Sequence, residues 1–314
     1  MKLRLSVLAL LAACGGDKVA PMQNTLAGGK PTEPILTADY PLAGGANGLL
    51  WDAATKTLYL TDDKAHSLLS FDDAHACCTA RRTLPDALVP EKGVSLGDMI
   101  KLDDGTILAT SFGFDGDGTI YSIPSAGAPT KIAVAGDKMR IGIARTNDGR
   151  YYEGYFSSAK PHVGNVAQFD PASGKEVDLV KDSKLHKLVG LVAMHDALFV
   201  AQQDKQDLTA NAIFKITLPT GEVTQVAAGL PSADALILLP NGDLLTSGVA
   251  GISRITQSGG VTPVNLGGTF GEIYGLAYDD EKHRIFFIER GGAEGTDEHG
   301  PRKPDALHIR PFTP

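Results

Sequence analysis

The sequence predicts an all-β protein folded as a six-bladed β-propeller with four-stranded blades. One pattern, in which a tight turn joins two apolar strands, occurs six times along the 314 residues. Its copies follow one another at roughly 40–50 residues, a spacing that is typical of propeller blades. No stretch has the 3.6-residue apolar period of an amphipathic helix of useful length, which argues against an α/β fold.

The six copies share an apolar run, a polar turn and a second apolar run. They span residues 47–62, 97–111, 141–156, 189–203, 233–248 and 274–289. Three of the turns, DDG at 103–105, NDG at 147–149 and PNG at 240–242, are strong signals for a hairpin. Each copy is therefore expected to form the first and second strands of a blade.

A third apolar segment follows every copy, and a fourth follows most of them. The expected third strands are residues 68–71, 119–123, 166–169, 212–216, 252–255 and 307–309, and examples of the fourth are 130–134, 177–180 and 223–227. The sixth unit stops after its third strand. We expect residues 34–37, which include Ile35 and Leu36, to complete that blade and close the ring.

Composition and charge exclude one class of partner. The chain is 43% hydrophobic and 21% charged, as in ordinary globular proteins. Its formal net charge is −8, and it becomes −10 without residues 1–13, which carry Lys2 and Arg4. Nucleic-acid binding needs clustered cations, and only isolated basic pairs such as Arg81-Arg82 occur. We expect no nucleic-acid partner, and we expect a monomer.

The start of the chain has the features of an export signal. Lys2 and Arg4 precede an apolar run over residues 5–13, which is shorter than the roughly 20 apolar residues that span a bilayer. Residues 11–14, Leu-Ala-Ala-Cys, resemble the lipobox of bacterial lipoproteins, in which the cysteine is lipidated. The alternative is an ordinary signal peptide with an incidental cysteine.

The lipobox interpretation divides the chain into three parts. These are a signal peptide at 1–13, a flexible tether at 14–33 that begins with the lipidated Cys14, and the propeller at 34–314. Cys14 would then bind the protein to a lipid membrane. By resemblance to Gram-negative lipoproteins, the absence of an aspartate directly after Cys14 favours the outer membrane, facing the periplasm or the cell surface.

Two further cysteines, Cys77 and Cys78, are adjacent in an expected loop. Export would place them in an oxidising compartment, where they would form a vicinal disulfide or remain free thiols. Their spacing is not the C-x-x-C pattern of a metal site.

A functional site is expected at one mouth of the central channel. Long, polar loops between the second and third strands are predicted there, including residues 157–165, 203–211 and 290–305. The first positions of the inner strands should line this mouth. They are Asn47, Asp98, Arg140, Val189, Asp234 and Tyr274.

Three of these residues offer oxygen ligands. Asn47, Asp98 and Asp234 would converge at the mouth and could coordinate Ca²⁺ or another divalent metal. The alternative for the two aspartates is a structural one, in which they accept hydrogen bonds from backbone amides of neighbouring strands.

The chain resembles the regucalcin/gluconolactonase family of six-bladed propellers over roughly residues 40–270. NGLLWD at 47–52 is similar to the first-blade phrase Glu-Gly-Pro-x-Trp of that family. The segment RIGIARTNDGRYYEGYF at 140–156 and the segment ADALILLPNGDLL at 233–245 resemble its third-blade and fifth-blade phrases. The resemblance implies a metal-dependent hydrolase of lactones or small esters.

Departures from the family concern the metal. The resemblance implies Glu, Asn and Asp as metal ligands, and these positions are Asn47, Val189 and Asp234 in this chain. The substrate-binding asparagine of the family falls at Gly142, whereas its substrate-binding arginine corresponds to Arg140. An amide removes one charge from the site and a valine cannot act as a ligand, so calcium would bind weakly without loop residues. The residues that could help are Asp62, Asp115, Asp117 and Glu289.

Other catalytic patterns are weak. The sequence has no G-x-S-x-G, Walker A or H-E-x-x-H motif. His162 and His299 lie on long loops and would be general bases or simply solvated side chains.

Three hypotheses follow. The first is a membrane-anchored, exported propeller that binds a small molecule or partner at its mouth through a degenerate metal site. The second is a calcium-dependent lactone or ester hydrolase in which Asp234 and Arg140 are catalytic. The third is an interaction scaffold without a small-molecule site.

Overall fold

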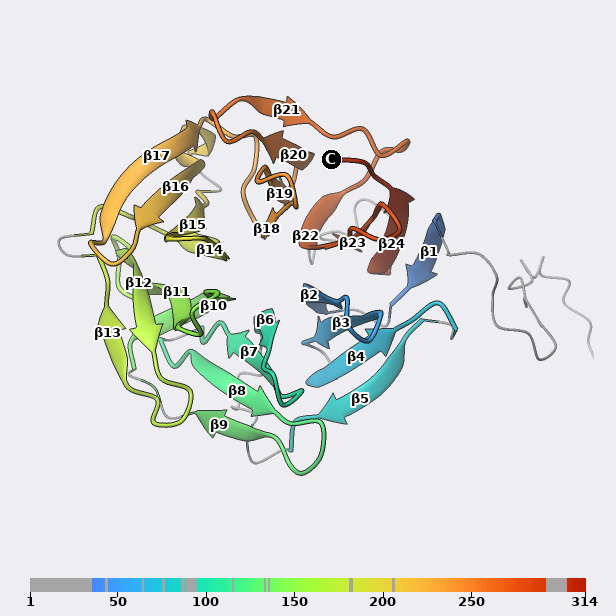
Figure 1. Cartoon of the computed structure of the whole chain (residues 1–314), viewed down its shortest axis with the longest axis horizontal. Helices are drawn as coiled ribbons and strands as arrows, with labels where there is room; N and C mark the ends of the chain where they lie inside the picture. Colours follow the sequence, from blue (N-terminus) through green and yellow to red (C-terminus); the bar gives the residue numbers. More distant parts are fainter. Residues whose placement is uncertain are drawn as a thin grey trace, which may run out of the picture. The chain divides into compact units, whose positions relative to one another are not determined.

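Six four-stranded antiparallel sheets surround a common axis in the computed structural model of the chain (Figure 1). The structure describes residues 36–42, 45–63, 65–74, 77–85, 88, 95–114, 116–132, 134, 136–180, 183–204, 207–291 and 304–314. The sheets belong to one unit, Glu33–Pro314. The predicted six-bladed propeller is therefore confirmed.

The first three blades each consist of four strands that are consecutive in the sequence. Blade one contains β2 (Ala46–Asp52), β3 (Thr57–Asp62), β4 (Ser67–Phe71) and β5 (Thr79–Thr83). Blade two contains β6 (Leu96–Lys101), β7 (Ile107–Ser111), β8 (Thr119–Ile123) and β9 (Thr130–Ile132). Blade three contains β10 (Lys138–Arg145), β11 (Tyr151–Ser157), β12 (Gly164–Phe169) and β13 (Glu176–Asp178).

Blades four and five follow the same order, and blade six combines both ends of the propeller. Blade four contains β14 (Leu188–Met194), β15 (Ala197–Gln202), β16 (Ala212–Thr217) and β17 (Glu222–Ala228), with a 3-10 helix, η2 (Leu208–Ala210), before β16. Blade five contains β18 (Leu236–Leu238), β19 (Leu244–Gly248), β20 (Gly251–Ile255) and β21 (Val261–Pro263). Blade six contains β22 (Glu272–Asp279), β23 (Arg284–Arg290), β24 (Ala306–Pro311) and β1 (Ala38–Pro41).

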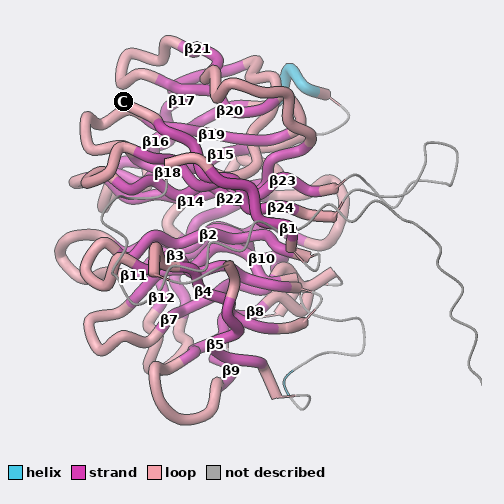
Figure 2. The backbone as a smooth tube through the Cα atoms, turned by 90° about the vertical axis from the view of Figure 1, so that its right-hand side faces the viewer, coloured by secondary structure: helices cyan, strands magenta, loops and turns pink. Residues whose placement is uncertain are grey.

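The core lies between neighbouring blades. Second strands such as β7 and β15 are buried at every position, because they face a blade on each side, whereas the outermost β21 is exposed throughout. Each buried apolar cluster combines residues of two adjacent blades; Ile120 and Ile143, for example, join blades two and three. Figure 2 views the sheets from the side and shows that strands form nearly all of the regular structure, as predicted.

Ring closure is confirmed, but the closing strand lies later in the sequence than expected. Its residues are Ala38–Pro41, which pair with β24 from Ile309 to Ala306, rather than residues 34–37. Ala38 and Tyr40 pack on the apolar cluster between blades six and one, while Leu36 is 42% exposed. The alternation of inward and outward side chains over residues 38–41 is the strand signal, and apolarity at Ile35 and Leu36 was misleading.

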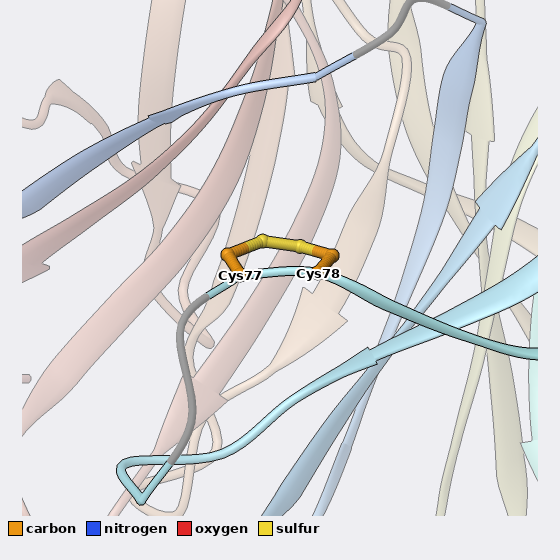
Figure 3. Close-up of a disulfide and its surroundings, with 2 residues drawn as sticks. All are labelled: Cys77 and Cys78. Atoms are coloured by element: carbon orange, nitrogen blue, oxygen red, sulfur yellow. A yellow bond between two sulfur atoms is a disulfide. The ribbon is translucent and has the colours of Figure 1, made fainter. Parts of the chain in front are cut away.

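Cys77 and Cys78 form a vicinal disulfide (Figure 3). Of the two states that the sequence left open, the structure has the oxidised one. Both cysteines lie just before β5 and pack on the same apolar cluster between blades one and six.

Several predicted features lie outside the described residues. They are the signal peptide, Cys14 and the tether up to residue 33, Asp115, and residues 292–303 of the blade-six loop with His299. Within the part of the chain that the structure describes, no helix is long and apolar enough to cross a membrane.

Replacing Tyr40 by alanine tests the closing strand. Tyr40→Ala should lower the free energy of unfolding by about 2 kcal/mol, because it removes a half-buried ring from the contact between blades six and one. The Tyr40 ring centroid lies 5.4 Å from that of Phe71. The matched control, Leu36→Ala, should change it by less than about 0.5 kcal/mol. Denaturant titration measures both, and equal losses would place the closing strand at residues 34–37 after all.

Candidate functional site

Irregular pairing at the start of the inner strands points side chains into the channel. Five inner strands pair with a register shift within their first five residues, for example between Ala46 and Leu49 in blade one and between Ile273 and Leu276 in blade six. Similar shifts occur in blades two, three and four. A bulge of this kind leaves the extra residue unpaired and turns it out of the sheet.

The six predicted mouth residues all line one cavity. This mouth cavity has a volume of about 320 Å³. Asn47, Asp98, Arg140, Val189 and Tyr274 lie on inner strands, and Asp234 lies just before β18. Their placement around one cavity agrees with the sequence prediction, while their catalytic and metal-binding roles stay predictions.

A second set of lining residues was not among the six inner-strand candidates, although Gln203 and Arg290 begin loops that the sequence analysis placed at the mouth. They flank the inner strands or follow the second strands, and they are Ser95, Phe112, Phe114, Lys187, Gln203 and Arg290. A signal for them exists in the repeats, since Phe112, Gln203 and Arg290 occupy equivalent places at the end of β7, β15 and β23. Taking the residues after each second strand as well would have found half of this set.

Asp98 and Asp234 belong to blades two and five, which are opposite in a ring of six. Burial and the nearby Asp234 carboxylate raise the pKa of Asp98 from 3.8 to about 8. Asp98 is therefore largely protonated at neutral pH. It is also one of the residues that border a second cavity, which opens toward the other end of the channel.

The residues at the mouth do not fit the calcium site that the resemblance implies. Asn47 directs its Nδ2 to the carbonyl oxygen of Leu96, at 2.8 Å. Val189 is 4% exposed and presents only hydrocarbon. Among the described residues, no group of three or more His, Cys, Asp or Glu side chains is placed to hold a metal ion. Asp234 remains as the one charged residue at the three family positions.

Arg140 is held by acidic side chains of its own blade. Its guanidinium is fully buried, and its Nε lies 2.6 Å from Oε2 of Glu153. It also donates to Glu176 and, at 2.7 Å, to the carbonyl oxygen of Gly118. Lys138 joins the same network through Glu176. These contacts fix β10 against β11 and β13, which gives Arg140 a structural role that the sequence alone did not indicate.

Two cations lie at the rim of the mouth. Lys187 donates from Nζ to Oε1 of Gln203 at 3.1 Å. The guanidinium of Arg290 stacks on the Tyr274 ring, 3.9 Å from its centroid, and its Nη2 is 3.6 Å from Oδ2 of Asp63. Burial raises the pKa of Asp63 to about 7, against the opposing effect of Arg290.

Aromatic side chains form one wall of the mouth. The Phe112 ring centroid lies 5.2 Å from that of Phe114 and 5.8 Å from that of Phe156, in edge-to-face geometry. His162 extends the row, 5.0 Å from Phe156, and its Nδ1 is 2.8 Å from the carbonyl oxygen of Ser157. Phe114 is 54% exposed and reaches the cavity.

The other acidic candidates do not line the mouth cavity within the described residues. Asp62 caps a turn by accepting from the Ala65 amide at 2.9 Å. Asp117 is exposed in the loop before β8. Glu289 lies on the outer side of β23, with Oε2 3.0 Å from Nε2 of His308. None of the three is therefore positioned to complete a metal site with Asp234.

Comparison with solved structures finds the same fold in proteins of very different sequence. A gluconolactonase from Xanthomonas campestris has a TM-score of 0.62 at 13% identity, over 86% of this chain and 87% of that one. The calcium-binding protein regucalcin from Agrobacterium tumefaciens has a TM-score of 0.60 at 13% identity, over 88% and 94%. A luciferin-regenerating enzyme has a TM-score of 0.61 at 12% identity, over 87% and 95%.

The chain is thus similar in structure to six-bladed propellers of the gluconolactonase and regucalcin type, which confirms the resemblance that its sequence suggested. At these identities the similarity shows the fold alone. No protein-family model and no curated protein matches the sequence.

Replacing Asp98 by asparagine tests its protonation. In the folded protein Asp98 keeps its proton up to about pH 8, whereas in the unfolded chain it loses the proton above pH 3.8. The free energy of unfolding therefore decreases as the pH rises from about 4 to about 8. Asp98→Asn resembles the protonated form. Its melting temperature should match wild type near pH 4 and exceed it by several degrees above pH 8, since 1 kcal/mol corresponds to roughly 2–4 °C.

The control for this measurement is Asp103→Asn. Asp103 is exposed and pairs with Arg145, which lowers the pKa of Asp103. This variant should show no gain in melting temperature at high pH. A constant difference between Asp98→Asn and wild type across the whole pH range would contradict the raised pKa.

Proposed function

We propose that this protein is an exported, membrane-anchored propeller that binds a small molecule in its mouth cavity, through a site that no longer holds the metal of its structural relatives. The observation that carries the proposal is the valine at position 189. It places hydrocarbon where the family resemblance requires a ligand, on the blade opposite Asn47. The cavity itself is kept, with a volume at the small end of the range for ligand sites.

Binding rather than metal chemistry also fits the charges. Calcium takes six to eight oxygen ligands, commonly several carboxylates. At the mouth, Asp98 is largely neutral near pH 7 and the Asn47 amide is uncharged. Of the three predicted oxygen ligands, Asp234 is therefore the charged one. A divalent cation would meet one charged oxygen donor from the inner strands together with the cations Lys187 and Arg290.

One observation favours the second candidate, a hydrolase of lactones or small esters. Asp98 and Asp234 interact electrostatically across the channel, and one of them is protonated at neutral pH. A protonated and an ionised carboxyl group in one cavity form a general acid and base pair. In this mechanism Asp98 would protonate the leaving oxygen and Asp234 would accept a proton from water.

Membrane anchoring completes the first proposal. Ala306 of β24 lies beside Glu289, near the mouth residue Arg290, and Pro41 pairs with Ala306. Strand β1 therefore runs toward the mouth, and its first residue, Ala38, is on the side of the opposite face. A lipid on Cys14 would tether the propeller through this strand.

Metal analysis and lactone hydrolysis test the choice between the two functions. The purified protein should contain no stoichiometric calcium, and its hydrolysis of simple lactones should be at background and unchanged by a chelator. The double variant Asn47→Glu, Val189→Asn restores two oxygen ligands beside Asp234 and should gain measurable calcium affinity by calorimetry. A double variant that cannot add charge, Asn47→Gln with Val189→Ala, is its control.

Stoichiometric calcium in wild type, together with chelator-sensitive lactone turnover, would refute the binding proposal. If turnover is present but insensitive to the chelator, Asp234→Ala decides the hydrolase mechanism. Activity that survives this substitution would rule out the Asp98 and Asp234 pair as acid and base.

Substitution of Cys14 tests the anchor. Wild-type protein expressed in a bacterial host should sediment with membranes and dissolve in detergent. Cys14→Ala removes the lipid attachment atom and should release the protein to the soluble exported fraction, with the propeller still folded by circular dichroism. The control is Cys77→Ala with Cys78→Ala, which leaves Cys14 intact and should stay on the membrane. Membrane association unaffected by Cys14→Ala would contradict lipidation.

A further inference from the structure

We propose that His308 makes the closure of the ring sensitive to pH. The closing strand β1 is held firmly while the His308 ring carries two protons, and it is held less firmly once the ring has lost one of them. The inference rests on contacts within blade six, and it is independent of what the mouth cavity binds.

The His308 ring joins the closing strand to the second strand of its blade. His308 lies on β24, where it is opposite Asp39 of β1 in the register. Its Nδ1 is 2.6 Å from Oδ1 of Asp39, and its Nε2 is 3.0 Å from Oε2 of Glu289 on β23. The His308 side chain is 8% exposed, so little of the ring is available to water. One imidazole therefore connects three strands.

Both contacts together require the doubly protonated ring. A neutral imidazole has one N–H group and one nitrogen lone pair, whereas the imidazolium has two N–H groups. With a carboxylate at each nitrogen, the neutral ring would place its lone pair against an oxygen lone pair, and one hydrogen bond would be lost. The imidazolium donates to Asp39 and Glu289 at once, and its charge strengthens both bonds.

Asp39 stays ionised when His308 loses a proton. Burial opposes the ionisation of Asp39, but hydrogen bonds from His308 and Arg310 outweigh this effect and lower its pKa. The Arg310 guanidinium remains charged throughout the range in which histidine titrates. The Asp39 carboxyl group therefore does not supply the proton that the second hydrogen bond needs.

The charges around the ring balance when His308 is protonated. Arg310, on the same strand, has its Nη2 2.7 Å from Oδ1 of Asp39, and its Nη1 donates to the carbonyl oxygen of Ala38 at 3.0 Å. Among the described residues, no other charged group makes a hydrogen bond or ion pair with His308. Two cations then face the carboxylates of Asp39 and Glu289. A neutral His308 would leave an excess of negative charge beside a largely buried ring.

The other neighbours of the ring are uncharged and hold it in place. Phe287 on β23 stacks on it, with the centroids 4.9 Å apart and an angle of 23° between the planes. Phe270, before β22, lies 5.1 Å away in edge-to-face geometry. Opposite Glu289, β22 contributes Ile273. A change in the charge of His308 is therefore felt at Asp39 and Glu289, since the ring has no other polar partner on this side of the blade among the described residues.

Loss of the second proton weakens the hold on β1. This strand of four residues pairs with β24 at the outer edge of its sheet, and Tyr40 adds an apolar contact on the face away from Asp39. Histidine ordinarily changes charge between about pH 5 and pH 8. The contribution of the imidazolium to closure is therefore present at the acidic end of this range and is lost as the pH rises.

Hydrogen–deuterium exchange of the full-length protein at pH 5.5 and pH 8.5 tests the inference. Rates corrected for the intrinsic effect of pH give the protection of the amides of residues 38–42 relative to those of the inner strand β14. Global unfolding, to which Asp98 contributes, affects both segments and cancels in this ratio. The ratio should fall by about fivefold in wild type, because a charge-assisted hydrogen bond is lost. The change is modest because the Asp39 side chain is 58% exposed.

Two variants remove the pH dependence in different ways. His308→Gln has no titratable ring, and its relative protection should be low and change by less than about twofold between the two pH values. Asp39→Asn keeps His308 but replaces one carboxylate by an amide, which can donate to a ring lone pair or accept from an N–H group. Its change should also stay below about twofold, so the inference remains testable if His308→Gln folds poorly.

The control is His283→Asn. His283 is an exposed histidine in the turn between β22 and β23 of the same blade, and its Nδ1 lies 3.2 Å from the Tyr278 hydroxyl rather than beside a carboxylate. This variant should keep the wild-type change. Equal relative protection of β1 at the two pH values in wild type would overturn the inference. A change of wild-type size that persists in either His308→Gln or Asp39→Asn, or that disappears in His283→Asn, would do the same.

Discussion

The close approach of the inner strands around the channel is the constraint on which the ring and its mouth depend. A Cβ atom at Gly48 would lie 2.1 Å from the carbonyl oxygen of Gly97 in the next blade, and one at Gly275 would lie 2.4 Å from that of Asn47. Glycine alone fits at such a distance. These glycines adjoin Asn47, Asp98 and Tyr274, so the residues that let the strands meet also stand beside those that line the mouth.

In a scaffold fixed in this way, the backbone sets the shape of the mouth and the side chains set its chemistry. The backbone around the channel cannot move far without breaking contacts between blades, so the identity of each inward side chain decides what the mouth can bind. Val189 illustrates this, because it lines the cavity with hydrocarbon at the position where the resemblance implies a metal ligand. The same fold in a gluconolactonase and in regucalcin is therefore compatible with a different task in this chain.

The sequence repeats predicted the fold. The site was only partly predictable, because it depends on contacts between residues that are far apart in the sequence. The six turns and apolar runs determine blade number because every blade repeats the same local signals. The closing strand was misplaced because apolarity at Ile35 and Leu36 is a weaker signal than the alternation at Ala38–Pro41. Arg140 lines the mouth as expected, but Glu153 on β11 and Glu176 on β13 hold its guanidinium, and a network that spans three strands of one sheet is not visible in a linear motif.

Asp98 connects the electrostatics of the mouth to its apolar lining. It borders both the mouth cavity and the cavity at the other end of the channel, whose lining is mainly apolar. Hydrocarbon on one side and the Asp234 carboxylate across the channel both disfavour its ionised form. The mouth therefore contains a buried carboxyl group that stays protonated at neutral pH, so any charged ligand bound beside it would shift this proton equilibrium.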